Sequence, residues 1–293
     1  MKKNSKKIVF GLDLGGFRKC NSALAMAVRS EEGQITVTIF RSHPFSGARN
    51  SWETLPNEEV EFLTWLNQED NSAALFVDCP IDLQTLLCQL DLRGPGKCVE
   101  ELSFIWELTH RPIDKAFGGL APIASNLGFL VARFLRVLKQ SRTQGLVGEK
   151  VFETYPRAAL EVFMNSRNPP AYKSGKAKER AKKRKKIQKT LKLHLDGNAV
   201  LSENRLDAVI CALVGLCERE NQLERKMRRK LTAIAGKIRR QRLERMKPPE
   251  GYVLPAGEIN QKKIKVEFCK FSYDNFPNDK SNPNKKNKKQ EGK

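Results

Sequence analysis

The first part of the chain alternates between short apolar runs and polar turns, in the pattern of a small β-sheet. Four runs have the length and apolar character of strands, and a Glu-Glu-Gly turn joins the second run to the third as in a hairpin. The segment between the third and fourth runs carries apolar residues at helical spacing instead. The first three strands are therefore expected to form an antiparallel meander. We assign the strands to residues 7–14, 22–29, 34–41 and 73–79, and the helix to residues 57–68.

The middle of the chain predicts helices and one more strand. Proline and glycine recur over residues 92–119, which predicts irregular structure with a short helix inside it. Pro156 suits the first turn of a helix that follows the next strand. Ser202 or Asn204 can cap a later helix, which is apolar on most sides and therefore expected to be buried. We assign helices to residues 99–108, 121–140, 157–164 and 202–216, and a strand to residues 150–155.

Two basic segments and a polar tail mark the later part of the chain. Residues 172–192 hold eleven Lys or Arg against one Glu, and residues 218–247 hold twelve against four acids. The second segment predicts a long basic helix, which ends at two consecutive prolines. We assign further strands to residues 251–255 and 263–271. We expect one domain over residues 1–258 that includes both basic segments, an extra strand within residues 259–273, and a basic disordered tail over residues 274–293.

The charge balance bears on the partner rather than on the fold. The chain has 54 Lys and Arg against 33 Asp and Glu, which gives a net charge of +21. This excess favours a nucleic acid as partner, with an acidic membrane surface as the second choice. No apolar stretch is long enough and free enough of charge to cross a bilayer, so no membrane span is expected. The seven cysteines contain no CxxC pair, which predicts reduced thiols in a cytoplasmic protein that can associate with the nucleoid.

Four acidic residues stand where they can form a metal site. Asp13, Asp78 and Glu153 lie at or near the ends of apolar strands, where ligands of open α/β sheets bind. Asp207 lies on the buried helix, where a carboxylate needs a partner. Carboxylates brought together repel each other, and a hard cation such as Mg²⁺ or Mn²⁺ relieves the repulsion. The pattern therefore predicts these four acids as metal ligands and catalytic residues, with the two-metal arrangement typical of phosphodiester hydrolysis.

Each acid also has an ordinary explanation. The two strand-end aspartates would serve as turn or capping residues. Glu153 would pair with Arg157 on the following turn, and Asp207 would pair with Arg205 or another surface base. What favours the metal site is the joint order of features: a strand ending in Asp, two hairpin strands, a helix, a second strand ending in Asp, and a late helix carrying Asp.

Seven sequence motifs follow one another along the chain. They are GLDLGG (11–16), VDCPID (77–82), RPIDKAFGG (111–119), ETYPRAA (153–159), YKSGKAKER (172–180), ENRLDAVICAL (203–213) and PEGYVLP (249–255). Taken in this order, they resemble the family called domain of unknown function 429, whose members are regarded as predicted nucleases with a ribonuclease-H-like fold. That family looks distantly similar to Holliday-junction resolvases and the integrase superfamily. The resemblance covers roughly residues 7 to 258.

The resemblance implies a fold and assigns roles to the acids. It implies a ribonuclease-H-like mixed α/β sheet flanked by helices, to which this chain adds the long basic helix and the disordered tail. Asp13 matches the acid of the first strand, and Asp78 matches the acid of the family's Asp-x-Pro motif. Glu153 matches the Glu of its Glu-x-x-Pro motif, and Asp207 matches the acid of its Leu-Asp-Ala helix.

The basic segments supply the expected nucleic-acid contacts. Lys173, Gly175 and Arg180 match a Lys/Gly/Arg stretch of the family that is expected to face phosphates. No aromatic residues interleave with the basic ones, so the contacts should be mainly to phosphates and carry little sequence information. The residues expected to bind nucleic acid are Lys173, Arg180, Lys183, Arg184, Arg228, Arg229, Arg239 and Arg240.

Three other functions compete with a metal-dependent nuclease. GLDLGG also resembles the first phosphate loop of actin-like sugar kinases and phosphotransferases, although Cys79-Pro80-Ile81 after the second aspartate is no glycine-rich loop. A nucleic-acid-binding protein without catalysis is the second alternative. Membrane-surface binding by the helix over residues 219–247 is the third, and its apolar seam is narrow. That helix is also able to pair with a second copy, which would make a homodimer, or with another protein.

Overall fold

The computed structural model describes the strands and helices that build the core. The described residues are 7–15, 21–46, 57–68, 72–81, 127–166, 168–197, 199–218 and 263–273. Several sequence predictions lie outside these ranges. They are the helix over residues 99–108, the basic helix over residues 218–247 with Arg228, Arg229, Arg239 and Arg240, the strand over residues 251–255, and the tail over residues 274–293.

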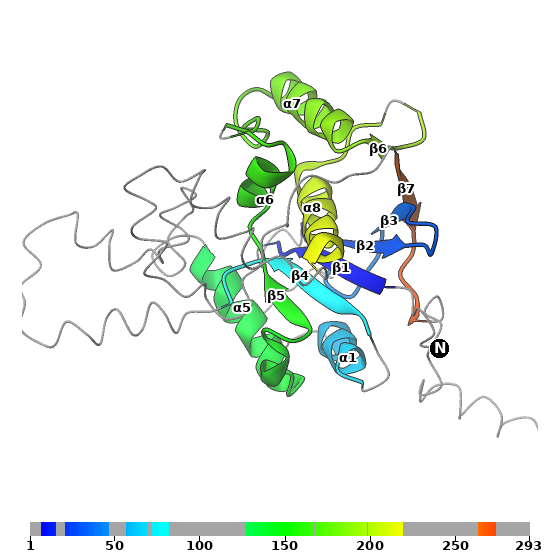
Figure 1. Cartoon of the computed structure of the whole chain (residues 1–293). Helices are drawn as coiled ribbons and strands as arrows, with labels where there is room; N and C mark the ends of the chain where they lie inside the picture. The colour runs from blue at the N-terminus through cyan, green and yellow to red at the C-terminus, as the bar shows by residue number, and fades with distance from the viewer. Residues whose placement is uncertain are drawn as a thin grey trace, which may run out of the picture.

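A seven-stranded mixed sheet forms the central layer of the molecule (Figure 1). The strand order is β5-β4-β1-β2-β3-β7-β6. β2 runs antiparallel to both β1 and β3, and the other neighbouring pairs are parallel. The strands are β1 (Lys7–Asp13), β2 (Ala23–Arg29), β3 (Ile35–Phe40), β4 (Ala74–Asp78), β5 (Val151–Glu153), β6 (Leu193–His194) and β7 (Ile264–Cys269).

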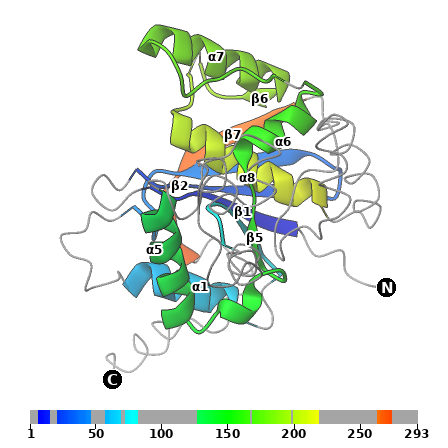
Figure 2. The same cartoon turned by 90° about the vertical axis from the view of Figure 1, so that its left-hand side faces the viewer.

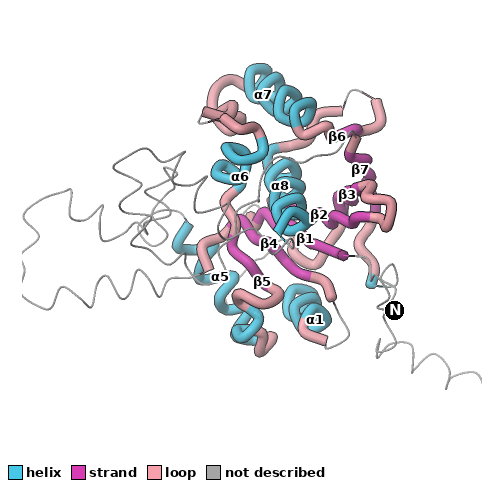
Figure 3. The backbone as a smooth tube through the Cα atoms, in the orientation of Figure 1, coloured by secondary structure: helices cyan, strands magenta, loops and turns pink. Residues whose placement is uncertain are grey.

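Helices cover both faces of this sheet (Figures 2 and 3). α8 lies directly on one face with α6 beside it and α7 at the periphery, whereas α1 and α5 cover the opposite face. None of these described helices combines the length and apolar character needed to cross a membrane. The helices are α1 (Asn57–Leu66), α5 (Leu127–Gln140), α6 (Pro156–Phe163), α7 (Ala177–Thr190) and α8 (Glu203–Glu218), with a short 3₁₀ turn at Gln144–Leu146.

The local pattern predicted most of these elements. Mixed α/β architecture, the antiparallel meander and Pro156 at the start of α6 are confirmed. The strand expected over residues 263–271 also exists, as β7, and pairs in parallel with β3 in the same sheet. The sequence analysis missed β6, because two residues are too few to show a periodic pattern.

Alternating side chains of the central strands divide the core into two. Val9 of β1 belongs to the core under α8, whereas Phe10 and Leu12 belong to the core under α1 and α5. This division follows from the two-residue period of a strand. On the α8 side, β2 contributes only alanines, at positions 23, 25 and 27. The small side chains leave room for the helix to come close to the strands.

Two glycines set how close α8 lies to the sheet. A Cβ added to Gly11 of β1 would stand 2.1 Å from the carbonyl oxygen of Ala208 and 2.3 Å from the amide nitrogen of Ala212. A Cβ added to Gly215 of α8 would stand 2.3 Å from a methyl carbon of Val9. The backbone of α8 therefore contacts the backbone of β1 directly where the two cross. This contact places Asp207, the residue before Ala208, close to the end of β1.

We expect Gly11→Ala to destabilise the protein by about 1–3 kcal/mol or more, because the new methyl group has to push α8 away from β1. Gly145→Ala is the matched control, since no atom lies within 4 Å of the Cβ it would add. Denaturant unfolding of the two variants measures the difference. Equal stabilities would contradict the close packing described above.

Candidate metal centre

Three aspartates meet at one end of the sheet. Asp13 is the last residue of β1 and Asp78 is the last residue of β4, and the two are paired in register across the parallel strands. Asp207 reaches the same point from α8. One carboxylate oxygen from each aspartate lies within 4.8 Å of the other two. The expected convergence of these three acids is therefore present, in a cluster able to hold a metal ion.

The position of Asp207 follows from where α8 begins and from its contact with β1. Ser202 precedes the helix, and its hydroxyl accepts a hydrogen bond from the amide of Arg205 at 3.4 Å. Of the two residues that the sequence offered as a cap, Ser202 is thus the one that caps the helix. Asp207 follows in the next turn, next to Ala208 over Gly11, and its side chain is fully buried.

The three carboxylates disturb one another strongly. Burial raises the pKa of Asp13 well above its usual value, and the neighbouring charges of Asp207 and Asp78 raise it further. Burial also raises the pKa of Asp78 to about 7, with Lys173 opposing the shift and Asp207 adding to it. The pKa of Asp207 is raised by burial as well. Without a cation among them, the three groups therefore resist being ionised together at neutral pH.

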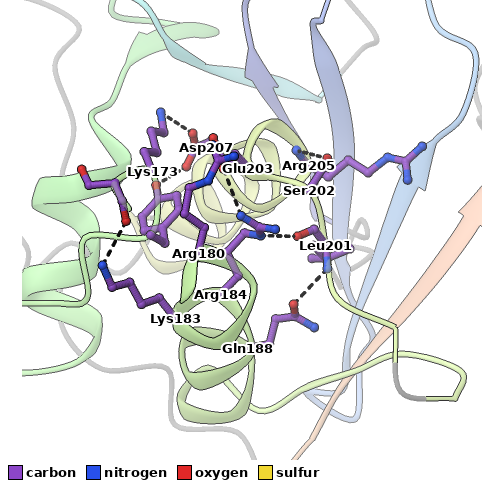
Figure 4. Close-up of polar contacts among 12 residues, drawn as sticks. Lys173, Arg180, Lys183, Arg184, Gln188, Leu201, Ser202, Glu203, Arg205 and Asp207 are labelled. Atoms are coloured by element: carbon purple, nitrogen blue, oxygen red, sulfur yellow. Dashed lines mark hydrogen bonds and ion pairs between the residues drawn. The ribbon is translucent and has the colours of Figure 1, made fainter. Parts of the chain in front are cut away.

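Two residues from the loop before α7 close over Asp207. The hydroxyl of Tyr172 donates a hydrogen bond to Asp207 Oδ1, and Lys173 Nζ lies 2.6 Å from Asp207 Oδ2 (Figure 4). Burial alone would lower the pKa of Lys173, but the charges of the three aspartates hold it above its usual value. Lys173 therefore stays protonated and serves as the internal counter-ion of the cluster. This contact differs from the phosphate contact expected for Lys173. It is the pairing of Asp207 with a surface base that the sequence allowed, with Lys173 in place of Arg205.

Glu153 has a different position from the other acids. It is buried at the end of β5, and its Oε2 accepts a hydrogen bond from the amide of Ile81 at 2.8 Å. It therefore anchors the segment that follows Asp78, and it lies outside the group of three aspartates. Its role as a metal ligand stays a prediction. Arg157 donates to the carbonyl oxygen of Pro169 at 2.7 Å, a contact that the sequence did not suggest.

The predicted basic residues of α7 bind the protein itself. Arg180 and Arg184 both reach Glu203 Oε1, at 2.9 and 3.0 Å (Figure 4). Lys183 donates to the carbonyl oxygen of Ser174 at 3.0 Å. These contacts hold α7 against the start of α8. A role of these side chains in binding nucleic acid stays a prediction, and the structure gives each of them an internal partner.

A buried ion pair supports the same end of the sheet from the opposite face. Arg133 of α5 lies 2.5 Å from Glu59 of α1, and both side chains are fully buried. Arg133 also donates to the carbonyl oxygen of Gly15 at 2.6 Å, while the amide of Gly15 donates to the Ser22 hydroxyl at 2.9 Å. Gly15, two residues after Asp13, is thus held at both its carbonyl and its amide. This ion pair was not predicted from the sequence. A charged residue within the apolar pattern of each helix could have indicated it.

Comparison with known proteins gives one family. A family model described as "Protein of unknown function (DUF429)" matches residues 11–228, which is well over half of the chain. The chain belongs to the DUF429 family. This confirms the resemblance found from the motifs, and the matched region of the DUF429 chain contains all three clustered aspartates. No curated protein and no solved structure was found to match.

The free energy of unfolding of the metal-free protein should fall as pH rises from about 4 to about 7. The folded chain keeps a proton on Asp78 up to a pKa of about 7, whereas the unfolded chain releases it near 3.8. Each unit of this shift corresponds to about 1.4 kcal/mol. Denaturant unfolding in EDTA across this range measures the slope, and Asp78→Asn should flatten it. A variant with a slope as steep as that of the wild type would contradict the assignment.

Lys173→Met should make the protein depend more on a bound cation. The metal-free cluster loses its internal counter-ion, so the melting temperature in EDTA should drop, and added Mn²⁺ should raise it more than it does for the wild type. Lys176→Met is the matched control, because Lys176 is exposed in the same segment. The interpretation fails if both variants respond to Mn²⁺ as the wild type does.

Proposed function

We propose that this DUF429 protein is a divalent-metal-dependent nuclease that hydrolyses phosphodiester bonds in DNA or RNA. The observation that carries the proposal is the convergence of Asp13, Asp78 and Asp207 within 4.8 Å at one end of the sheet. Three carboxylates at such distances repel one another, and Lys173 supplies one positive charge against the three. The site is therefore suited to a positively charged cofactor.

The donor set suits Mg²⁺ or Mn²⁺. All three side chains offer hard oxygen ligands, which these ions prefer, and three protein ligands leave coordination positions for water and for a substrate phosphate. When bound, such ions generate a hydroxide nucleophile and stabilise the charge on the leaving oxygen. The chain itself holds the carboxylates in place through the register of β1 with β4 and through the contact of α8 with Gly11.

The order of the strands supports a ribonuclease-H-like fold as part of the proposal. An antiparallel meander, β1 to β3, is followed by β4 and β5, which add to the other side of β1 in parallel. Acids end β1 and β4, and the late helix α8 brings the third acid across β1. This is the order of features that favoured a metal site in the sequence. β7 and β6 extend the sheet beyond β3.

The charge of the chain favours a nucleic acid as substrate. A net charge of +21 attracts a polyanion, although the reacting centre itself is acidic. A metal ion between the aspartates would remove this conflict, because it makes the centre attractive to a phosphate. The acidic cluster and the net positive charge of the chain then both suit a phosphate substrate.

A sugar-kinase site fits less well, because two of the described backbone amides beside Asp13 and Asp78 already have partners within the protein. The Gly15 amide donates to the Ser22 hydroxyl at 2.9 Å. After Asp78, the Ile81 amide donates to Glu153 at 2.8 Å. A phosphate loop needs such amides to point at the ligand. Saturable binding of ATP by calorimetry would favour the kinase instead.

Purified protein should cleave DNA or RNA in the presence of Mg²⁺ or Mn²⁺ and lose the activity in EDTA. Asp13→Asn and Asp207→Asn should each lower the rate at least about 100-fold, because each removes a charged ligand of the cation. Exposed Glu31 and Glu32 provide the matched control, and their Gln variants should keep full activity. Cleavage that survives in both aspartate variants would rule out the proposal. Binding without metal-dependent cleavage would favour a non-catalytic protein.

A further inference from the structure

The outer face of α7 carries a row of exposed lysines that repeat at helical spacing. Five exposed lysines follow one another at intervals of four, three, one and three residues, which places them on one side of the helix. Within the described part of the chain, none of the five has an ion-pair partner. We call these residues the lysine face: Lys178, Lys182, Lys185, Lys186 and Lys189.

The opposite side of α7 is fixed to the rest of the protein. Ile187 is fully buried in the core, and Gln188 accepts a hydrogen bond from the Leu201 amide at 3.0 Å. Arg184 donates to the carbonyl oxygen of Leu201 at 2.9 Å and also pairs with Glu203 (Figure 4). The helix therefore cannot turn about its axis to bring the lysine face inward. Its lysines are exposed to solvent, and α7 itself lies at the periphery of the molecule (Figures 1 and 2).

The lysine face is electrostatically unfavourable without a partner. Lysines spaced three or four residues apart on a helix repel each other, and α7 has Glu179 as its one acid. The arginines that do find an acid use Glu203 of α8. An external chain of negative charges would relieve the repulsion and release counter-ions.

We propose that the lysine face of α7 is the surface on which the phosphate backbone of a nucleic acid docks. This inference rests on the proposed nuclease function and adds the surface that holds its substrate. It replaces Arg180, Lys183 and Arg184 as the main phosphate-binding residues, because their polar groups already bind Glu203, Ser174 and Leu201.

The dimensions of the lysine face match a phosphate backbone. Lys178 and Lys189 are eleven residues apart. At 1.5 Å per residue the face is about 16 Å long. Phosphates of one strand of a duplex rise about 3.4 Å each along the axis while they wind around it, so a straight face of this length can lie beside a few of them.

The lysine face is also connected to the metal centre through a short stretch of chain. Lys173 contacts Asp207, and Lys178 follows it five residues later. Their Cα atoms are therefore at most about 18 Å apart. A strand lying along the lysine face can continue to the aspartates within a few nucleotides.

A lipid surface is a poorer partner for this helix. Ile187 is the one large apolar residue of α7, and it is buried. A helix that binds membranes places an apolar face in the lipid, and α7 has none to offer. Charge without apolar contact favours the phosphates of a nucleic acid.

Binding of a short fluorescent DNA duplex in EDTA tests the inference, with anisotropy measured at several salt concentrations. Each lost phosphate contact should lower the slope of log affinity against log salt by about 0.9. Lys178→Gln/Lys182→Gln/Lys186→Gln should therefore flatten the slope by about 2.7. The matched control removes the same charge from exposed lysines elsewhere, as Lys139→Gln/Lys263→Gln/Lys270→Gln, and should leave the slope near that of the wild type.

Equal slopes for the two triple variants would overturn the inference, because the binding would then follow net charge alone. No binding by the wild type at low salt, or tighter binding of the wild type to anionic vesicles than to the duplex, would overturn it too. If the first triple variant does not fold by circular dichroism, Lys185→Gln/Lys189→Gln takes its place, with an expected change of about 1.8. EDTA prevents cleavage, so the result is independent of whether the aspartates are catalytic, which the cleavage assay decides.

Discussion

The close contact between α8 and β1 determines the rest of the site. A helix usually rests on a sheet through side chains, but here Gly11 lets the backbone of Ala208 and Ala212 approach the strand directly. The same contact carries Asp207 to the ends of β1 and β4. Apolar packing thus holds α8 on β1, and the same packing brings the three negatively charged aspartates together. Lys173 partly offsets that repulsion in the metal-free chain.

The local sequence pattern was enough to predict those strands, helices and acidic residues whose burial can be read from their own segment. The apolar runs identified the central strands, and a carboxylate at a strand end or on a buried helix identified Asp13, Asp78 and Asp207. Contacts between distant segments were harder to predict from the sequence, because they depend on which surfaces of different elements meet. The pairing of β7 with β3 and the contact of Lys173 with Asp207 join segments that are far apart in sequence.

The basic helix α7 is a second case in which the sequence predicts an element but not its contacts. Composition shows that α7 is strongly basic, but it does not show which side of the helix packs. Ile187 is a single large apolar residue, and one such residue gives no periodicity. The structure resolves the question through Glu203, which draws two arginines inward and leaves the lysines outside. A basic helix can therefore contain both structural cations and cations available to a ligand.

The strand β7 has a practical consequence for how the protein is prepared. The family region ends at residue 228, and a shortened protein designed on that region would lack residues 264–269. The hydrogen-bonding edge of β3 would then be bare along the six residues that β7 pairs with, and β6 would lose its neighbour as well. Bare edges of this kind recruit other chains and lead to aggregation. A shortened version intended for crystallisation should therefore retain the sequence through residue 273.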